Sequence, residues 1–311
     1  MAKLIILAGL PGCGKSSYAE AFIAAKNIFP DTKTSADHWA VHSSDAIREE
    51  LFGDASCQAD NNRVFETMHK RVKADLEKGI NVIYDATNVT RKSRRSAIAL
   101  AGKHDLVECH IVWAPINVCV DRDAQRDRTV GKEVIEKFVR RWQSPFYDEG
   151  FSDIIIVSKF GYEFDRSHYI SSMTAQMHIP HDNPHHTLGV YEHCMEAYQQ
   201  LKANEVAPHV VRAATYWHDV GKPFTKGYKN KPDSNEIDYS VAHYYDHQNV
   251  GAYMAYGLYS DHEMGNSFIV QFSWLINNHM EPFFNSKYYQ QLPENLKKQV
   301  DMIHKYDRIA H

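Results

Sequence analysis

Residues 3–25 have the sequence KLIILAGLPGCGKSSYAEAFIAA and decide the fold of the first half of the chain. A short run of β-forming residues, too brief for a helix, leads into glycines, and a segment with helical character follows. This order predicts a strand, a loop and a helix. Such a unit belongs to an α/β domain, in which helices flank a parallel sheet.

The loop of this unit fits the pattern G-x4-G-K-S, in which Lys15 and Ser16 follow the last glycine. Backbone N–H groups and the helix N-terminus hold phosphates in such a loop. We expect Lys15 to neutralise the β- and γ-phosphates and Ser16 to bind Mg²⁺. The prediction is therefore a site for ATP or another NTP with Mg²⁺, formed by Gly9, Gly12, Gly14, Lys15, Ser16 and Ser17.

Two further segments predict carboxylates beside the phosphates. Residues 39–53, WAVHSSDAIREELFG, predict a strand and then a helix, with Ser44 as N-cap and Asp45 in the first turn. Residues 79–95 predict a buried strand that ends at Asp85. Because the carboxyl ends of strands line the ligand crevice of an open α/β sheet, we expect both carboxylates near the γ-phosphate. A carboxylate there can accept the proton of an attacking hydroxyl or hold Mg²⁺ through water.

Residues 119–142 predict two helices with a glycine break between them. Arg122, Arg126 and Arg128 are spaced so that at least two of them share a helix face. Such a segment can close over phosphates as a lid whose arginines stabilise the transferred charge. A solvated charged helix is the alternative, because aspartates neutralise much of the run.

The set GLPGCGKSS, SSDAIR, VIYDATNVTRKSRR and DRDAQRDR, across about residues 1–160, resembles the 5′-hydroxyl polynucleotide kinase family. The resemblance implies that Asp45 is the general base for the 5′-hydroxyl and that Arg48 contacts the acceptor phosphate. It also implies that Asp85 is an acid of the acceptor site and that Arg126 is the lid arginine on the donor phosphates. Small-molecule P-loop kinases share much of this pattern, so the acceptor stays open.

Histidine distinguishes the second half of the chain from the first. Five of the 19 histidines precede residue 165 and fourteen follow it. A chain of 311 residues is long enough for two domains of about 100–150 residues each. We therefore predict a P-loop kinase-like domain over residues 1–165 and an all-α domain over residues 166–311.

Separate predicted helices of the second half carry residue types that bind metal ions. Imidazoles and carboxylates must come from several helices, because no single helix can surround an ion. We expect one metal to be held by His193, His218, Asp219 and Asp307. Asp219 would bridge to a second metal, completed by His247 and His279. Two such ions can activate water and stabilise both the attacking and the leaving oxygen.

The order H…HD…H…H…D is similar to that of the HD phosphohydrolase superfamily, over about residues 175–311, with EHCMEAY and HDVGKP as its most specific parts. The resemblance implies one or two divalent transition metals, among Mn, Ni, Co, Fe and Zn. It also implies a catalytic role for Asp219 and a contact of Lys222 with a substrate phosphate; an ordinary cation at a helix C-terminus is the alternative for Lys222. Three further histidines are weaker candidates: His185, His186 and His243.

Composition limits the class of protein. Hydrophobic residues are 43% and charged residues 24% of the chain, as in ordinary globular proteins. A net charge of −4 argues against sequence-independent wrapping of long nucleic acid. The five cysteines lack CxxC spacing, which predicts reduced thiols. No apolar run approaches the roughly 20 residues that span a bilayer, and no signal peptide is evident, so we expect a cytoplasmic protein without a membrane partner.

Together the two halves would add a phosphate to a hydroxyl and hydrolyse a phosphoester, so they must act on different ends or different molecules. The combined resemblance implies end healing of RNA or DNA: phosphorylation of a 5′-hydroxyl, opening of a 2′,3′-cyclic phosphate, and removal of a 3′-phosphate. A separate RNA ligase would be the partner. Two alternatives remain open. One is a small-molecule or nucleotide kinase fused to a nucleotide phosphohydrolase, and the other is a nucleotide-binding regulator with a non-hydrolytic HD pocket.

Overall fold

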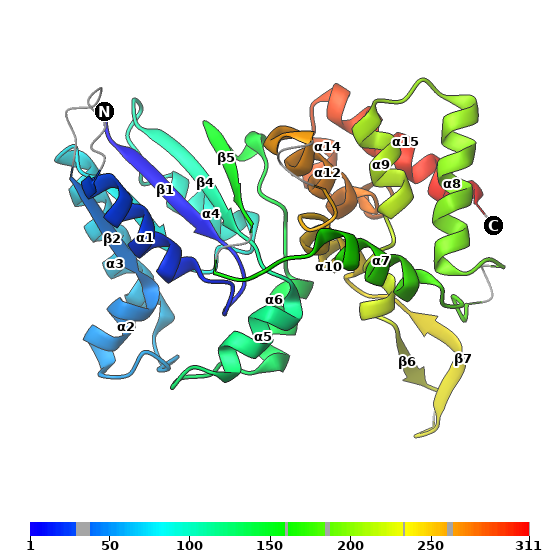
Figure 1. Cartoon of the computed structure of the whole chain (residues 1–311), viewed down its shortest axis with the longest axis horizontal. Helices are drawn as coiled ribbons and strands as arrows, with labels where there is room; N and C mark the ends of the chain where they lie inside the picture. The colour runs from blue at the N-terminus through cyan, green and yellow to red at the C-terminus, as the bar shows by residue number, and fades with distance from the viewer. Residues whose placement is uncertain (29–37, 159–160, 184–186, 233, 260–263, 311) are drawn as a thin grey trace. The chain divides into compact units, whose positions relative to one another are not determined.

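The computed structural model describes residues 1–28, 38–158, 161–183, 187–232, 234–259 and 264–310 (Figure 1). The chain divides into two compact units. One unit comprises Met1–Phe138 and Pro145–Glu163, and the other comprises Val139–Ser144 and Phe164–His311. Among the described residues, every helix is too short or too polar to cross a membrane.

The first unit is built on a parallel five-stranded sheet with the strand order β2-β3-β1-β4-β5. The strands are β1 (Lys3–Ala8), β2 (Trp39–Ser43), β3 (Asn81–Asp85), β4 (Leu106–Val112) and β5 (Asp153–Val157). The flanking helices are α1 (Lys15–Ile28), α2 (Ser44–Phe52), α3 (Asn61–Glu77), α4 (Arg91–Ile98), α5 (Ile116–Ala124) and α6 (Lys132–Arg140), with a 3₁₀ turn at Tyr147–Glu149. The predicted α/β fold with flanking helices is confirmed.

Strand β1 occupies the centre of this sheet because its side chains are apolar on both faces. Its residues Leu4 to Ala8 are almost completely buried, as expected for a central parallel strand covered on both sides. On one face Ile5 and Leu7 pack with Ile83 of β3 and with Ala19 of α1. Helix α1, which follows the glycine loop, is thereby fixed on this face of the sheet.

The second unit is mainly helical, which confirms the prediction for the second half. Its helices are α7 (Arg166–Met177), α8 (Val190–Asn204), α9 (His209–Trp217), α10 (His247–Ala255), α12 (Asn266–Asn278), α13 (Glu281–Phe284), α14 (Lys287–Gln290) and α15 (Glu294–Ile309), with a 3₁₀ turn at Lys222–Phe224. Helices α8, α9, α12 and α15 pack against one another, and α10 packs on α12. Phe272, Trp274 and Leu275 of α12 are fully buried in this core.

A two-stranded antiparallel hairpin interrupts the helices of the second unit. It consists of β6 (Gly227–Asn230) and β7 (Ile237–His243). No strand was predicted here from the sequence. The signal for it is the alternation of larger apolar and polar residues in IDYSVAH, which has the period of a strand. Because helices are predicted on both sides of this segment, so short an alternation is easily overlooked.

Candidate active sites

The phosphate-binding loop depends on glycine because the backbone bends sharply and other chain segments approach it closely. Gly12 and Gly14 have positive φ angles of 78° and 102°. A Cβ atom on Gly12 would lie 2.2 Å from the carbonyl oxygen of Cys119, and one on Gly9 would lie 2.4 Å from that of Val112. Since real Cβ contacts are never so short, only glycine fits at these two positions.

Side chains of the loop are positioned by hydrogen bonds within the first unit. The Lys15 ammonium donates to the carbonyl oxygens of Gly9 (3.1 Å) and Leu10 (2.7 Å), so it lies along the loop. The Ser16 hydroxyl donates to Oδ2 of Asp85 at 2.8 Å. Asp85 is buried at the end of β3, next to β1 in the sheet. A hydroxyl and a carboxylate in contact are the pair that holds Mg²⁺ in P-loop proteins, and these two residues fit that ion.

The carboxylate predicted as general base lies at the start of α2. The N-cap is Ser43 and the helix begins at Ser44, so the predicted N-cap was wrong by one residue, because Ser43 is the last residue with extended dihedral angles. Asp45 is in the first turn, with its side chain 61% exposed. Nη1 of Arg48 donates to Asp45 Oδ1 at 2.6 Å, and Nη2 donates to Asn61 of α3 at 3.0 Å. Arg48 thus fixes the orientation of an otherwise accessible carboxylate.

The predicted lid, residues 119–142, contains part of α5, a turn and α6, and a buried carboxylate of α5 holds the turn. Asp123 accepts hydrogen bonds from the backbone N–H groups of Val130 (3.0 Å) and Gly131 (2.9 Å). The intervening turn carries Arg126, which is exposed, and Arg128, whose Nη1 lies 3.6 Å from Asp45 Oδ2. The structure therefore brings Arg128 to the predicted general base.

The third arginine of this segment contacts the phosphate-binding loop itself. Arg122 donates from Nη1 to the carbonyl oxygen of Cys13 (3.3 Å) and from Nη2 to that of Gly161 (2.6 Å). Its guanidinium also lies 5.3 Å from the centre of the Tyr162 ring. Of the three predicted lid arginines, two are thus held by groups of the kinase site.

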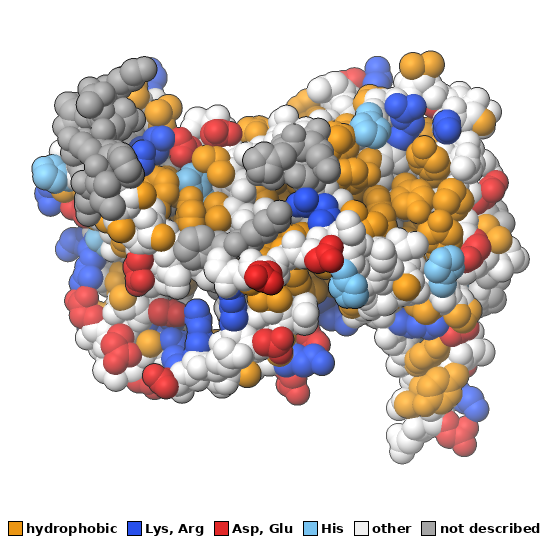
Figure 2. Space-filling view, in the orientation of Figure 1, with side chains coloured by type: hydrophobic (Ala, Val, Ile, Leu, Met, Phe, Trp, Pro, Cys, Tyr) orange, Lys and Arg blue, Asp and Glu red, His pale blue; other side chains and the backbone are white. Residues whose placement is uncertain are grey.

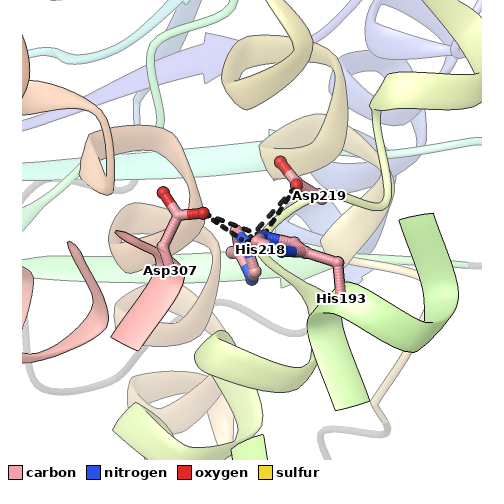
Figure 3. A group of neighbouring side chains, drawn as sticks. All are labelled: His193, His218, Asp219 and Asp307. Atoms are coloured by element: carbon pink, nitrogen blue, oxygen red, sulfur yellow. Dashed lines mark hydrogen bonds and ion pairs between the residues drawn. The ribbon is translucent and has the colours of Figure 1, made fainter. Parts of the chain in front are cut away.

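The second unit brings the six predicted metal-binding residues into two adjacent groups. The first group is His193, His218, Asp219 and Asp307, whose ligand atoms lie within 4.8 Å of one another (Figure 3). His193 Nε2 is 2.9 Å and His218 Nε2 is 3.2 Å from Asp307 Oδ1. Figure 3 shows the two imidazoles meeting between the carboxylates, which come from separate segments.

The second group shares Asp219 with the first and adds two histidines. His247 Nε2 lies 3.2 Å and His279 Nε2 lies 3.9 Å from Asp219 Oδ1. The other oxygen, Oδ2, faces the first group, at 3.4 Å from His218 Nε2 and 3.7 Å from His193 Nε2. Because each carboxylate oxygen faces a different pair of imidazoles, Asp219 has the geometry of a bridging ligand.

Each of the four imidazoles is oriented by a backbone carbonyl. The Nδ1 atom of His218 lies 2.7 Å from the oxygen of Thr215, and the Nδ1 atoms of His247 and His279 lie 2.8 Å from oxygens three residues earlier. His193 Nδ1 lies 2.9 Å from the oxygen of Ala310. A carbonyl can only accept, so each Nδ1 carries a proton and each Nε2 is directed at the cluster. Burial would lower the pKa of His218, but Cys194, Asp219 and Asp307 raise that pKa well above its ordinary value, so a metal ion would displace a proton from its Nε2.

Electrostatics also suit a cation at this cluster. Burial would raise the pKa of Asp219, but the charges of Lys222 and His218 hold that pKa well below its ordinary value. Burial and the charges of His247 and His218 lower the pKa of His279 to about 3, so this imidazole is neutral near pH 7. Oδ2 of Asp219 is buried, and the Lys222 ammonium lies 2.6 Å from it. The donor set therefore fits one or two divalent transition metals.

Lys222 is buried beside the cluster and is held by a histidine that the sequence analysis missed. Its Nζ lies 3.1 Å from Nε2 of His181, whose Nδ1 lies 2.7 Å from the oxygen of Leu188. His181 is one of many histidines in this half, and no spacing distinguishes it. Of the weaker candidates, His185 and His186 lie outside the described residues, whereas His243 stacks on Tyr245 and belongs to neither ligand group.

Comparison with known families assigns a class to each half. Residues 4–147 match the AAA domain family and residues 185–311 match the HD domain family. The first match includes the phosphate-binding loop, and the second includes all six predicted ligands. This chain therefore joins a P-loop kinase-type domain of the AAA family to a domain of the HD family.

Individual relatives cover only parts of this architecture. L-seryl-tRNA(Sec) kinase of Methanococcus maripaludis is 30% identical over 146 residues, which are 46% of this chain and 53% of that protein. This chain thus spans about half the length of that curated relative. A chain from the Pnkp1/Rnl/Hen1 RNA repair complex is 28% identical with a TM-score of 0.38, over 45% of this chain and 43% of that chain. A gluconokinase from Sinorhizobium meliloti is 16% identical with a TM-score of 0.35, over 51% and 84%.

Proposed function

We propose that this chain heals broken nucleic-acid ends, and that its substrate is RNA rather than DNA. In this proposal the P-loop domain, residues 1–165, transfers a phosphate from an NTP to a 5′-hydroxyl. The HD domain, residues 166–311, opens a 2′,3′-cyclic phosphate and removes the remaining 3′-phosphate. The two activities would prepare the opposite ends of one break for a separate RNA ligase.

The bridging geometry of Asp219 is the observation that carries the hydrolytic half of the proposal. His193, His218 and Asp307 would hold one divalent ion, and His247 and His279 the other. When bound, such ions supply activated water and stabilise charge on the phosphate. The Lys222 ammonium beside Asp219 would bind a phosphate oxygen, with His181 keeping it in position. Burial of the cluster excludes bulk water from the reacting phosphate.

The kinase half rests on an accessible carboxylate beside a phosphate-binding loop. Asp45 is exposed enough to meet a hydroxyl, and Arg48 and Arg128 orient it. In the proposed reaction Asp45 accepts the proton of the 5′-hydroxyl as that oxygen attacks the γ-phosphate. Lys15 neutralises the donor phosphates, and Ser16 with Asp85 would hold Mg²⁺. Arg126, exposed on the lid, would reach the donor phosphates when the lid closes.

The preference for RNA is supported by chemistry and by one relative. A 2′,3′-cyclic phosphate forms only where a 2′-hydroxyl is present, and its cleavage partner carries a 5′-hydroxyl. The relative from Methanococcus maripaludis, L-seryl-tRNA(Sec) kinase, has a name that describes an acceptor carried by RNA. Such an acceptor is larger than the free metabolites of small-molecule kinases and suits the open position of Asp45.

The test uses an RNA oligonucleotide with a 5′-hydroxyl and a 2′,3′-cyclic phosphate. It is incubated with ATP, Mg²⁺ and one of Mn²⁺, Ni²⁺, Co²⁺, Fe²⁺ or Zn²⁺, and both ends are analysed by mass spectrometry. The wild type is expected to phosphorylate the 5′ end and open the cyclic phosphate. Lys15→Ala should lose only the first activity, by about 10²–10³-fold because one stabilising charge is removed, and Asp219→Ala only the second.

Each variant is the control for the other, because the substituted residues belong to different units. Processing of free nucleosides or nucleotides with both RNA ends unchanged would contradict the proposal and favour a nucleotide kinase fused to a nucleotide phosphohydrolase. Tight nucleotide binding without hydrolysis at any metal would instead favour a regulator.

A further inference from the structure

The β6–β7 hairpin exposes aromatic rings that the fold does not need. Tyr239 on β7 is 67% exposed, and Tyr245, just beyond β7, is 57% exposed. In Figure 1 the two strands extend away from the helices of their own unit, and Figure 2 shows hydrophobic side chains on the surface of the hairpin. Rings in such positions add little to the core, because most of their area stays in water.

These rings form two pairs. His243 and Tyr245 lie parallel, with ring centres 5.4 Å apart and an angle of 7° between their planes. Tyr228 and Tyr239 form a second pair with ring centres 5.1 Å apart and planes tilted by 59°. The Lys229 ammonium lies 5.0 Å from the centre of the Tyr245 ring. Aromatic faces beside an ammonium group are the chemistry that binds the bases and phosphates of single-stranded nucleic acid.

Most other charges on the hairpin are already neutralised. Lys226 pairs with Asp182 at 2.7 Å, and Lys231 pairs with Glu236 at 2.9 Å. Lys229 has no carboxylate partner among the described residues of the chain. Binding at this surface would therefore depend on stacking more than on phosphate contacts.

The base of the hairpin continues directly into the metal-binding cluster. The residue after β7, Tyr244, accepts a hydrogen bond from Nδ1 of His247 at 2.8 Å, and its ring lies 5.5 Å from the Lys222 ammonium. The Tyr244 hydroxyl donates to the carbonyl oxygen of His181. Since Tyr245 is two residues from His247, the Cα atoms of these two residues lie at most about 7 Å apart.

We propose that the β6–β7 hairpin and Tyr245 bind the bases of single-stranded RNA next to the 3′ end that the HD site processes. This inference rests on the proposed function, because it takes an RNA 3′ end as the substrate. Tyr245 and His243 would stack the terminal bases, and Tyr228 and Tyr239 would stack bases further from the end. Paired RNA would be rejected, because its bases are already stacked inside the duplex.

The test measures strand binding and catalysis separately in the full chain. A fluorescent single-stranded RNA with a 3′-hydroxyl, which cannot be hydrolysed, reports binding by anisotropy. The variant with both Tyr239→Ala and Tyr245→Ala should bind it about 10–100-fold more weakly, since each stacked base contributes roughly tenfold or more. The variant with Tyr239→Phe and Tyr245→Phe keeps the rings and should bind like the wild type. Tyr147→Ala, an exposed tyrosine of the first unit, is the matched control.

The remaining readouts separate the hairpin from the reaction. Selectivity for a cyclic-phosphate RNA strand over a cyclic mononucleotide should fall by about the same factor in the alanine variant. The logarithm of wild-type affinity should fall with that of salt concentration with a slope of only about −0.7, as for one phosphate contact.

Equal RNA affinity of the wild type and the alanine variant overturns the hairpin proposal, whether or not the cyclic phosphate is opened. Loss of binding in a protein that opens no cyclic phosphate keeps the strand-binding surface and overturns the proposed reaction.

Discussion

The two sites of this chain are built in opposite ways. The phosphate-binding loop is one continuous stretch, and its shape comes from backbone dihedral angles at Gly12 and Gly14. The metal-binding cluster collects side chains from five helices or helix ends and one following residue, Asp219. A site made of local backbone is recognisable from spacing alone, whereas a site made of distant side chains exists only after the helices have packed.

The two sites also differ in how far their key carboxylates are exposed to solvent. Asp45 of the kinase site is 61% exposed, whereas the side chain of Asp219 is 1% exposed. An accessible base suits an acceptor that must enter and leave, and its charge costs little to maintain in water. A buried carboxylate is stable only with nearby cations, so the HD cluster should respond far more strongly to loss of a single charge.

The first and largest expected effect tests whether Asp219 is shared between two ions. Asp219→Asn keeps the shape of the side chain but removes its charge, so bound metal should fall toward zero and HD activity by about 10³-fold. Asp307→Asn should remove only the ion of the first group. The measurement is metal content of the purified chain by mass spectrometry, with circular dichroism to verify the helices.

Lys15→Ala is the control for this pair, since it should keep the full metal content. Equal metal loss in Asp219→Asn and Asp307→Asn would show that the bridge is wrong and that the two groups do not bind separately.

A smaller effect tests the backbone origin of the phosphate site. Gly12→Ala would force a Cβ to 2.2 Å from the Cys119 oxygen at a φ of 78°, so ATP binding should be lost. The matched variant is Gly53→Ala, at a φ of 68° with nothing within 4 Å of the added atom. It should cost only about 1–2 kcal/mol of backbone strain and keep ATP binding.

Isothermal titration with ATP measures both glycine variants, and HD activity shows whether the second unit is intact. Wild-type ATP affinity in Gly12→Ala would break the distinction between a backbone-built and a side-chain-built site.

The smallest effect concerns a carboxylate of the first unit that lies outside both sites. Burial would raise the pKa of Glu108, but hydrogen bonds from His110 and Lys3 outweigh it and lower that pKa from 4.5 to about 2. The folded chain therefore binds this proton less tightly than the unfolded chain. Its stabilising contribution is present above pH 4.5 and is lost as the pH falls toward 2.

Glu108→Gln should thus lower the stability of the first unit by about 1–2 kcal/mol at pH 7, after allowance for the part-exposed Lys3 partner. The difference from the wild type should shrink as the pH falls toward 2 and vanish below pH 2, where Glu108 is protonated in both states. Hydrogen exchange of the β4 amides measures this unit by itself. A difference between the two proteins that does not change with pH would contradict the ionic origin of the effect.

Much of the fold of the kinase half could be predicted from local sequence patterns. The strand, glycine loop and helix were predicted from residues 3–25, and the α/β fold is confirmed. Contacts between segments that are distant in the sequence could not be predicted in this way. The pairing of Ser16 with Asp85 joins residues 69 positions apart, and the contact of Arg128 with Asp45 depends on how Asp123 closes the lid turn.

In the HD half, the order of residue types predicted a metal site. The adjacent residues His218 and Asp219 occur together with histidines on other predicted helices. His181 was missed, since its role comes from a contact with Lys222 that no spacing encodes. The hairpin was missed because its alternating strand is only seven residues long.

The sequence by itself determined which backbone segments bend and which residue types face water or core, since these depend on glycine, proline and apolar periodicity over a few neighbours. Only the tertiary structure decided that Asp219 turns one oxygen to each imidazole pair, that His193 Nδ1 meets the carbonyl of Ala310, and that Lys222 meets His181. Those facts depend on distances between atoms far apart in the chain, and such distances are set by packing of whole helices rather than by local preference.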